Sequence, residues 1–181
     1  MNEVPQVTRK GLAATLTADR RIFVVALIVF AVDQITKYLV NHYLLLYVDE
    51  KVIIPGFFKF VHWGNTGAAW SLFTNRNGLL AIVGVVALFV LFQSRRHFDV
   101  HTKMGQLALG LIFGGILGNL TDRLVLKQVT DFLYFYLERR GAQPIGFPAF
   151  NVADSAICIG VALIFISTLK NDRTSAQPPA G

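Results

Sequence analysis

The most constraining feature of the sequence is the position of four aspartates inside or beside segments that are hydrophobic enough to enter a bilayer. These residues are Asp33, Asp122, Asp131 and Asp154, in a chain of which only 15% is charged. An ionised carboxylate costs several kilocalories per mole in hydrocarbon, so acids at such positions are functional candidates by default. Any fold of this chain must supply them with polar partners.

The composition indicates an integral membrane protein. Hydrophobic residues make up 54% of the 181 residues, and 15 are phenylalanine, which is more apolar surface than one small globule can bury. The net charge of +6 does not indicate nucleic-acid binding, because the basic residues lie at the ends of apolar runs and form no continuous basic face. The single cysteine, Cys158, excludes an intramolecular disulfide and is expected to be a buried, inert thiol.

Four apolar runs predict four transmembrane helices, at approximately residues 22–42, 77–94, 104–123 and 152–169. The first run could instead be a cleaved signal peptide, but no A-x-A site follows it. The predicted fold class is an all-α integral membrane protein with a small extracytoplasmic β-platform. Residues 1–170 form one membrane domain with an outer segment at 43–76, and residues 171–181 form a disordered cytoplasmic tail.

The basic residues beside the spans predict the orientation of the chain in the membrane. Nine lie on the side of the termini and six on the other, and the short connection between the second and third spans is basic. Both termini are therefore expected in the cytoplasm, with the two long connections outside. The nine are Arg9, Lys10, Arg20, Arg21, Arg95, Arg96, Lys103, Lys170 and Arg173, and the six are Lys51, Lys59, Arg76, Lys127, Arg139 and Arg140.

The first outer connection is unusually aromatic. Residues 51–63 read KVIIPGFFKFVHW, and β-branched and aromatic residues around the Pro55–Gly56 turn predict two short strands. Four aromatic residues in and around this connection fit the belt found where bilayer meets water: Tyr43, Tyr47, Trp63 and Trp70.

The third span carries two distinct helix faces. Gly110, Gly114 and Gly118 recur every four residues and predict close packing against another helix. Asn119 and Asp122 lie on a neighbouring face and would direct polar groups into the bundle. Two interpretations stay open for this polar face: a functional pocket, or helix–helix contacts in which Asp122 pairs with Arg123 or another nearby cation.

Asp131 and Asp154 are expected at the same membrane face. Asn151 and Asp154 have the spacing of a helix capping box, which accounts for Asp154 without any chemistry. Alternatively, two carboxyls held close together share a proton, and one can activate water while the other protonates a peptide carbonyl. The sequence contains no HExxH or GxSxG motif, and its histidines lack metal-ligand spacing, so neither a metal nor a cofactor is expected.

Five blocks in order resemble the bacterial lipoprotein signal peptidase family, also called signal peptidase II. They are DQITK from Asp33 to Lys37, NTGAA from Asn65 to Ala69, GGILGNLTDR from Gly114 to Arg123, VTDF from Val129 to Phe132, and FNVADS from Phe150 to Ser155. Each block alone is weakly specific. Together with four spans they cover nearly the whole chain.

The resemblance implies a multi-pass aspartic endopeptidase of the bacterial cytoplasmic (inner) membrane, with its active site toward the outer face. Its expected partners are membrane lipid, inhibitors of the globomycin type, and diacylglyceryl-modified prolipoproteins, which it cuts before the lipidated cysteine. The family's catalytic pair corresponds to Asp131 and Asp154. Substrate-binding or dyad-supporting roles fall on Asp33, Lys37, Asn65, Gly67, Asn119, Asp122, Arg123 and Asn151.

Two further expectations concern the outer segment and competing functions. Phe57, Phe58 and Phe60 are expected to help to hold substrate at the membrane surface. The alternatives are a small proton- or ion-coupled transporter, in which Asp33, Asp122 and Asp154 form a relay, and a noncatalytic membrane scaffold. A transporter is disfavoured because the acids cluster toward one face and the halves of the chain show no repeat.

Overall fold

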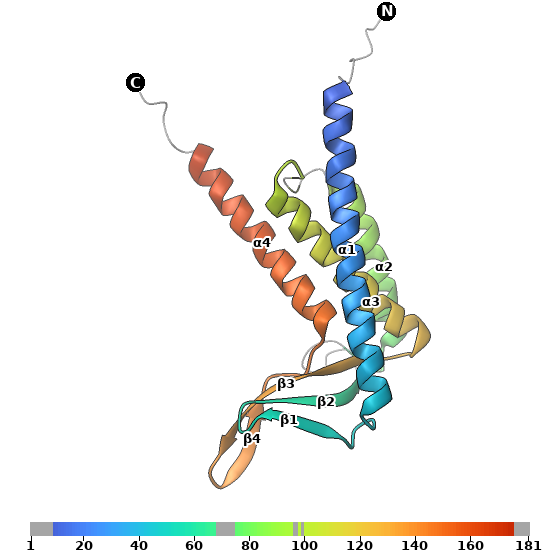
Figure 1. The fold of residues 1–181 in the computed structure, drawn as a ribbon, viewed down its shortest axis with the longest axis vertical. Coiled ribbons are helices and arrows are strands. Elements are labelled where there is room, and N and C mark those ends of the chain that lie inside the picture. The colour runs from blue at the N-terminus through green and yellow to red at the C-terminus, as the bar shows by residue number, and fades with distance from the viewer. Residues whose placement is uncertain (1–8, 68–74, 96–97, 99, 176–181) are drawn as a thin grey trace, which may run out of the picture.

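Four long helices dominate the computed structural model, which describes residues 9–67, 75–95, 98 and 100–175 (Figure 1). They are α1 (Arg9–Tyr43), α2 (Asn77–Ser94), α3 (Lys103–Val125) and α4 (Val152–Ser175). Within the described residues, each contains a segment long and apolar enough to cross a membrane: Leu16–Tyr43, Asn77–Ser94, Lys103–Val125 and Val152–Lys170. The prediction of four apolar helices is confirmed.

The helix ends differ from the expected span boundaries in two places. Helix α1 begins at Arg9, well before Ile22, because the polar residues that precede the apolar run continue the same helix. Helix α4 continues to Ser175, so the first five residues of the expected tail, 171–175, are helical. The remainder of that tail and Trp70 lie outside the described residues.

An antiparallel sheet lies at one end of the helices. In the part of the chain that the structure describes it has four strands in the order β1-β2-β3-β4: β1 (Glu50–Ile54), β2 (Phe58–Asn65), β3 (Val129–Arg139) and β4 (Ala142–Gly146). The β1–β2 hairpin turns at Gly56, whose φ is +75°, and confirms the two predicted strands. The turn between β3 and β4 contains Gly141 at φ +72°.

Strands β3 and β4 correct the expectation of an all-α fold. No strand was predicted in the second outer connection, but VTDFLYFYL from Val129 to Leu137 is rich in β-branched and aromatic residues. These residues pair with β2, in a register that sets Trp63 opposite Asp131. The chain is therefore a helical bundle combined with a sheet, and Asp131 belongs to a strand.

Helix α3 occupies the centre of the bundle and contacts the other three helices. A Cβ atom added at Gly114 would lie 2.6 Å from the Ala26 carbonyl oxygen of α1, and one at Gly110 would lie 2.6 Å from Cβ of Val25. Gly115 faces α4 instead, against the backbone of Ala153. The predicted glycine stripe is confirmed, and it brings the backbones of α1 and α4 close to α3.

The outward surfaces of the helices are apolar. On α2, for example, Ile82 and Phe89 are 62% and 64% exposed, as expected for side chains that face lipid. Cys158 is also exposed, contrary to the expected buried thiol. Figure 1 shows that α1 begins and α4 ends at one end of the bundle, and that the sheet lies at the opposite end.

Candidate active site

Asp131 and Asp154 line the same cavity, although they come from different structural elements. Asp131 lies near the start of β3, and Asp154 lies in the first turn of α4. The cavity has a volume of about 540 Å³. Its polar lining also includes Asn65, Gly67, Asn119 and Arg123. The structure thus brings together both predicted catalytic residues and four of the predicted supporting residues.

Asn151 contacts both acids. Its side-chain Nδ2 donates to Oδ1 of Asp131 at 2.8 Å. Its backbone N–H donates to Oδ2 of Asp154 at 3.3 Å, and its Oδ1 accepts from the backbone N–H of Asp154 at 2.9 Å. The last two bonds form the predicted capping box, so the capping and dyad interpretations describe the same residues and are compatible.

Each acid receives a second amide donor. Nδ2 of Asn65 donates to Oδ2 of Asp131 at 2.9 Å, and Nδ2 of Asn119 donates to Oδ1 of Asp154 at 2.7 Å. Amide donors are neutral, so they orient a carboxyl group without the strong preference for its ionised form that a cation would impose. Each carboxyl is therefore held in position by neutral donors.

Asp131 is protonated at an unusually high pH for an aspartate. Burial, and after it the negative charge of Asp154, raise the pKa of its carboxyl to about 7. The hydrogen bonds from Asn65 and Asn151 act in the opposite direction and lower this pKa. Near neutral pH the cavity therefore holds an acid that can donate as well as accept a proton.

Arg123 supports Asn65 through the backbone of the loop that follows β2. Its Nη2 donates to the carbonyl oxygen of Gly67 at 3.1 Å, and the Gly67 N–H donates to Oδ1 of Asn65 at 2.9 Å. Because Oδ1 of Asn65 is an acceptor in this contact, its Nδ2 is directed toward Asp131. The guanidinium thus positions a ligand of Asp131 through two intervening hydrogen bonds.

A buried ion triad lies behind the cavity. The Lys37 ammonium contacts Oδ2 of Asp33 at 2.9 Å, Oδ2 of Asp122 at 3.0 Å and Oδ1 of Asn119 at 2.9 Å. All three ammonium protons have acceptors, and Lys37 is only 2% exposed. The cation that pairs with Asp122 is therefore Lys37 of α1 and not Arg123.

The triad also orients Asn119. Oδ1 of Asn119 accepts from the Lys37 ammonium and, at 3.1 Å, from Nδ2 of Asn151. Nδ2 of Asn119 must therefore face Asp154. Asp33, Lys37 and Asp122 do not line the cavity of about 540 Å³. Their predicted support of the dyad would consequently act through Asn119 and the backbone, without contact with a substrate.

The apolar lining of the cavity was not predicted. It comes from the segment before α4, with Phe147, Pro148 and Phe150, and from Ile157 and Cys158 on α4. Phe57, Phe58 and Phe60 do not line it: the rings of Phe57 and Phe58 pack on Phe135, with centroids 5.4 and 4.7 Å apart. The only available signal was proximity in sequence, because FPAF directly precedes Asn151.

Comparisons with known proteins agree over most of the chain. Residues 25–170 match the family model described as Signal peptidase (SPase) II. A lipoprotein signal peptidase of Maridesulfovibrio salexigens is 38% identical over 154 residues, covering 82% of this chain and 94% of that protein. A second, of Geobacter metallireducens, is 37% identical over 161 residues, covering 87% of this chain and 96% of that protein.

Two solved structures share the fold. One, described as a bacterial membrane enzyme determined by the in meso method at 2.3 Å resolution, has a TM-score of 0.73 and 30% identity. The match covers 88% of this chain and 94% of the chain in that structure. The other, determined by the same method at 1.9 Å, has a TM-score of 0.68 and 33% identity, with coverage of 82% and 92%.

Proposed function

Because the chain belongs to the signal peptidase II family, it is an aspartic endopeptidase that removes signal peptides from prolipoproteins, and we propose that Asp131 and Asp154 catalyse this reaction. The observation that carries the proposal is that one asparagine, Asn151, bonds both carboxyls at the wall of a single cavity. The transporter alternative has no support in this family membership.

The proposed reaction begins with one carboxyl ionised and the other protonated. The carboxylate accepts a proton from a water molecule as the water oxygen attacks the scissile carbonyl carbon. The carboxylic acid donates its proton to the carbonyl oxygen, which gives a neutral tetrahedral diol. The carboxyl that took the proton from water then protonates the amide nitrogen, and the C–N bond breaks. The carboxyl that protonated the carbonyl oxygen recovers its proton from a hydroxyl of the diol.

We assign the resting proton to Asp131 and the water-activating role to Asp154. Burial raises the pKa of Asp131 to about 7, which favours a proton on this residue near neutral pH. Asp154 lies in the first turn of α4, where the helix dipole favours a negative charge. Asp131 lies on a strand and not in the first turn of a helix, so we place the negative charge on Asp154.

We propose that the substrate carries a diacylglyceryl group on the cysteine that follows the cut bond, and that the cavity lies toward the outer face of the inner membrane. The acyl chains would remain in the bilayer, since each buried methylene contributes about 0.8 kcal/mol, and the bond would stay at interfacial depth. The cavity meets this requirement, because Asp154 begins a predicted span and Asp131 lies just outside one. Its apolar wall suits the residues beside the cleaved bond.

The proposal is tested with a lipidated prolipoprotein and purified enzyme in detergent. Asp131→Asn and Asp154→Asn should each reduce cleavage by several orders of magnitude, while Asp49→Asn, a change in the outer loop, should retain it. Unchanged thermal unfolding of the two dyad variants separates lost chemistry from lost fold. Normal turnover by either dyad variant would contradict the assignment.

A second arm of this test addresses inhibition. Globomycin should block cleavage by the native enzyme, because we propose that such inhibitors occupy the cavity lined by Asp131 and Asp154. The same precursor without its diacylglyceryl group should be a poor substrate. Equal cleavage of the two precursors would contradict the proposed lipid requirement while leaving the catalytic pair intact.

A further inference from the structure

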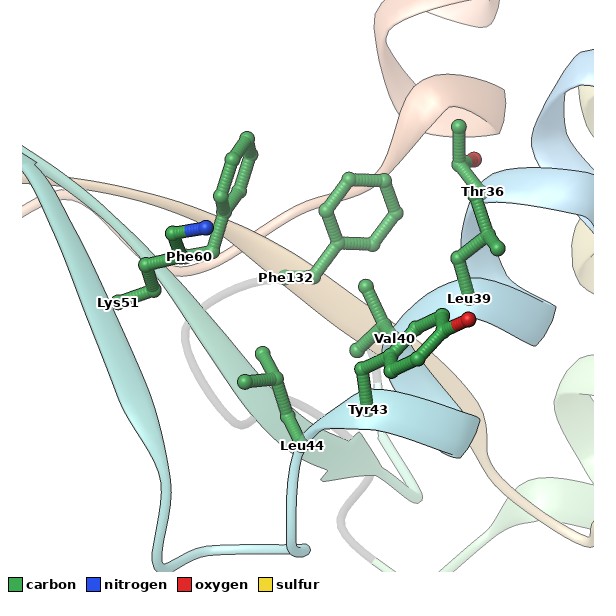
Figure 2. A pocket seen from close by; sticks show the side chains of 8 residues that line it. All are labelled: Thr36, Leu39, Val40, Tyr43, Leu44, Lys51, Phe60 and Phe132. Carbon is green, nitrogen blue, oxygen red and sulfur yellow. The ribbon is translucent and has the colours of Figure 1, made fainter.

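A second cavity, of about 350 Å³, lies between the end of α1 and the sheet, and it shares no lining residue with the cavity of the two acids. Figure 2 shows Val40 of α1 and Leu44, which directly follows that helix, on one side, and Phe60 and Phe132 of the sheet on the other. We call it the α1–sheet cavity. The peptidase chemistry described above does not use it.

The walls of this cavity are almost entirely carbon. Two α1 residues that line it, Thr36 and Tyr43, carry a hydroxyl group. Oγ1 of Thr36 donates to the carbonyl oxygens of Val32 and Asp33 at 2.8 and 2.9 Å. The hydroxyl group of Thr36 therefore has its hydrogen-bond partners within its own helix. The remaining wall consists of aliphatic and aromatic side chains, so the cavity favours an apolar occupant.

The cavity lies at the depth where hydrocarbon meets headgroups. The apolar span Leu16–Tyr43 of α1 ends among its lining residues, and β1 and β2 begin just beyond. Leu39, which also lines it, is 44% exposed on the lipid-facing surface of α1. An acyl chain of a lipid beside α1 can therefore reach the cavity without crossing a polar layer.

Lys51 adds a positive charge at the rim. It is the cross-strand partner of Phe60, and in Figure 2 its ammonium is directed toward the cavity. No carboxylate among the residues that the structure describes forms an ion pair with Lys51, and the adjacent Glu50 is paired with Lys59. The rim thus offers an unneutralised cation beside an apolar hole.

We propose that the α1–sheet cavity binds an anionic phospholipid, with part of one acyl chain among Val40, Leu44 and Phe132 and the phosphate on Lys51. Charge complementarity selects this occupant. A diacylglyceryl group on a cysteine bears no charge and would leave Lys51 unused, and a helix of about 10 Å diameter is too wide for this volume.

The test measures lipid retention by native mass spectrometry of the intact enzyme released from detergent. The probes are palmitoyl-oleoyl phosphatidylglycerol, which is anionic, and the zwitterionic phosphatidylcholine with the same chains. The native enzyme should retain phosphatidylglycerol about five-fold better, and Lys51→Gln should remove that preference. Val40→Phe, which fills the cavity, should reduce retention of both lipids.

Lys59→Gln is the matched control, because Lys59 lies on the neighbouring strand but is paired with Glu50 and packed over the rings of Tyr134 and Tyr136. It should leave the preference intact. An equal loss in the two lysine variants would indicate nonspecific surface charge and overturn the proposal. Displacement of phosphatidylglycerol by a diacylglyceryl-cysteine peptide, with a raised KM in Val40→Phe, would instead assign the cavity to substrate.

Discussion

Asp33 of α1 accepts a hydrogen bond from the backbone N–H of Ala153, 120 residues later in the chain, at 2.9 Å. Ala153 directly precedes Asp154. Asp122 makes the equivalent contact beside Asp131. Its Oδ2 accepts from the backbone N–H of Thr130 at 3.1 Å, and Thr130 directly precedes Asp131. Each acid of the buried triad therefore holds the backbone one residue before a member of the dyad.

The first prediction concerns Asp33. Asp33→Asn keeps an oxygen that can accept from Ala153, whereas Asp33→Ala removes the acceptor and leaves a buried N–H without a partner. We expect Asp33→Ala to lose more cleavage activity than Asp33→Asn at equal amounts of folded enzyme. The comparison of kcat between the two variants tests this, and equal kcat values would show that the backbone contact does not position Asp154.

The second prediction concerns Lys37, whose ammonium neutralises two carboxylates that are nearly inaccessible to solvent. Lys37→Met leaves both acids buried without a cation and should reduce the free energy of unfolding by roughly 3–5 kcal/mol. The triple variant with Asp33→Asn and Asp122→Asn removes the stranded charges and should recover part of this loss. Unfolding in detergent measures both, and no recovery would contradict a charge-based cause.

The third prediction is a pH dependence. Asp131 must hold its proton in the resting enzyme, and its pKa is raised to about 7 by burial and by Asp154, so kcat/KM should fall as the pH rises above about 7. Asn65 lowers this pKa through its hydrogen bond, so Asn65→Ala should move the decline to higher pH. A decline in Asn65→Ala at the same or a lower pH would reject the assignment of the proton to Asp131.

The fourth prediction concerns the glycine stripe. Gly114→Ala would bring a Cβ within 2.6 Å of the Ala26 carbonyl oxygen and 2.7 Å of Cβ of Val29, so α1 must move away from α3. We expect a loss of about 1–3 kcal/mol in the free energy of unfolding. Gly78→Ala on α2 is the control, because a Cβ there meets nothing within 4 Å. Similar stability of the two variants would contradict close packing.

The fifth prediction uses the single cysteine as a reporter of the catalytic cavity. Cys158 is exposed and lines the cavity that contains Asp131 and Asp154. A bulky maleimide should therefore label it and inhibit cleavage, and globomycin should slow the labelling. Cys158→Ala should remain active and insensitive to the reagent. Full activity of the labelled enzyme would show that substrate does not pass this side of the cavity.

The sequence was sufficient to predict the helices, because each apolar run is continuous and as long as a bilayer is thick. It was also sufficient for the first hairpin, where Pro55–Gly56 marks the turn between two aromatic segments. Strand β3 was missed for a physical reason. Its stability comes from pairing with β2, some 70 residues away, and a single sequence does not display such long-range partners.

The residues of the site were easier to predict than their contacts. Asp33, Lys37 and Asp122 are conspicuous because charges in apolar segments need partners, but the pairing of Lys37 with both acids depends on how α1 packs on α3. The expected role of Phe57, Phe58 and Phe60 in holding substrate stays a prediction, and composition could not show which aromatic rings pack within the sheet and which line the catalytic cavity. Phe147 and Phe150 line the cavity, and Phe57 and Phe58 do not.

The double contact of Asn151 has a consequence for an enzyme embedded in a fluid bilayer. Its backbone belongs to the turn that carries Asp154, and its side chain is bonded to Asp131, so a tilt of α4 moves both acids together. We expect changes in bilayer thickness to shift the depth of the pair before they alter the spacing within it. The rate of proton exchange should then vary little among membranes of different lipid composition, even where access of the substrate does vary.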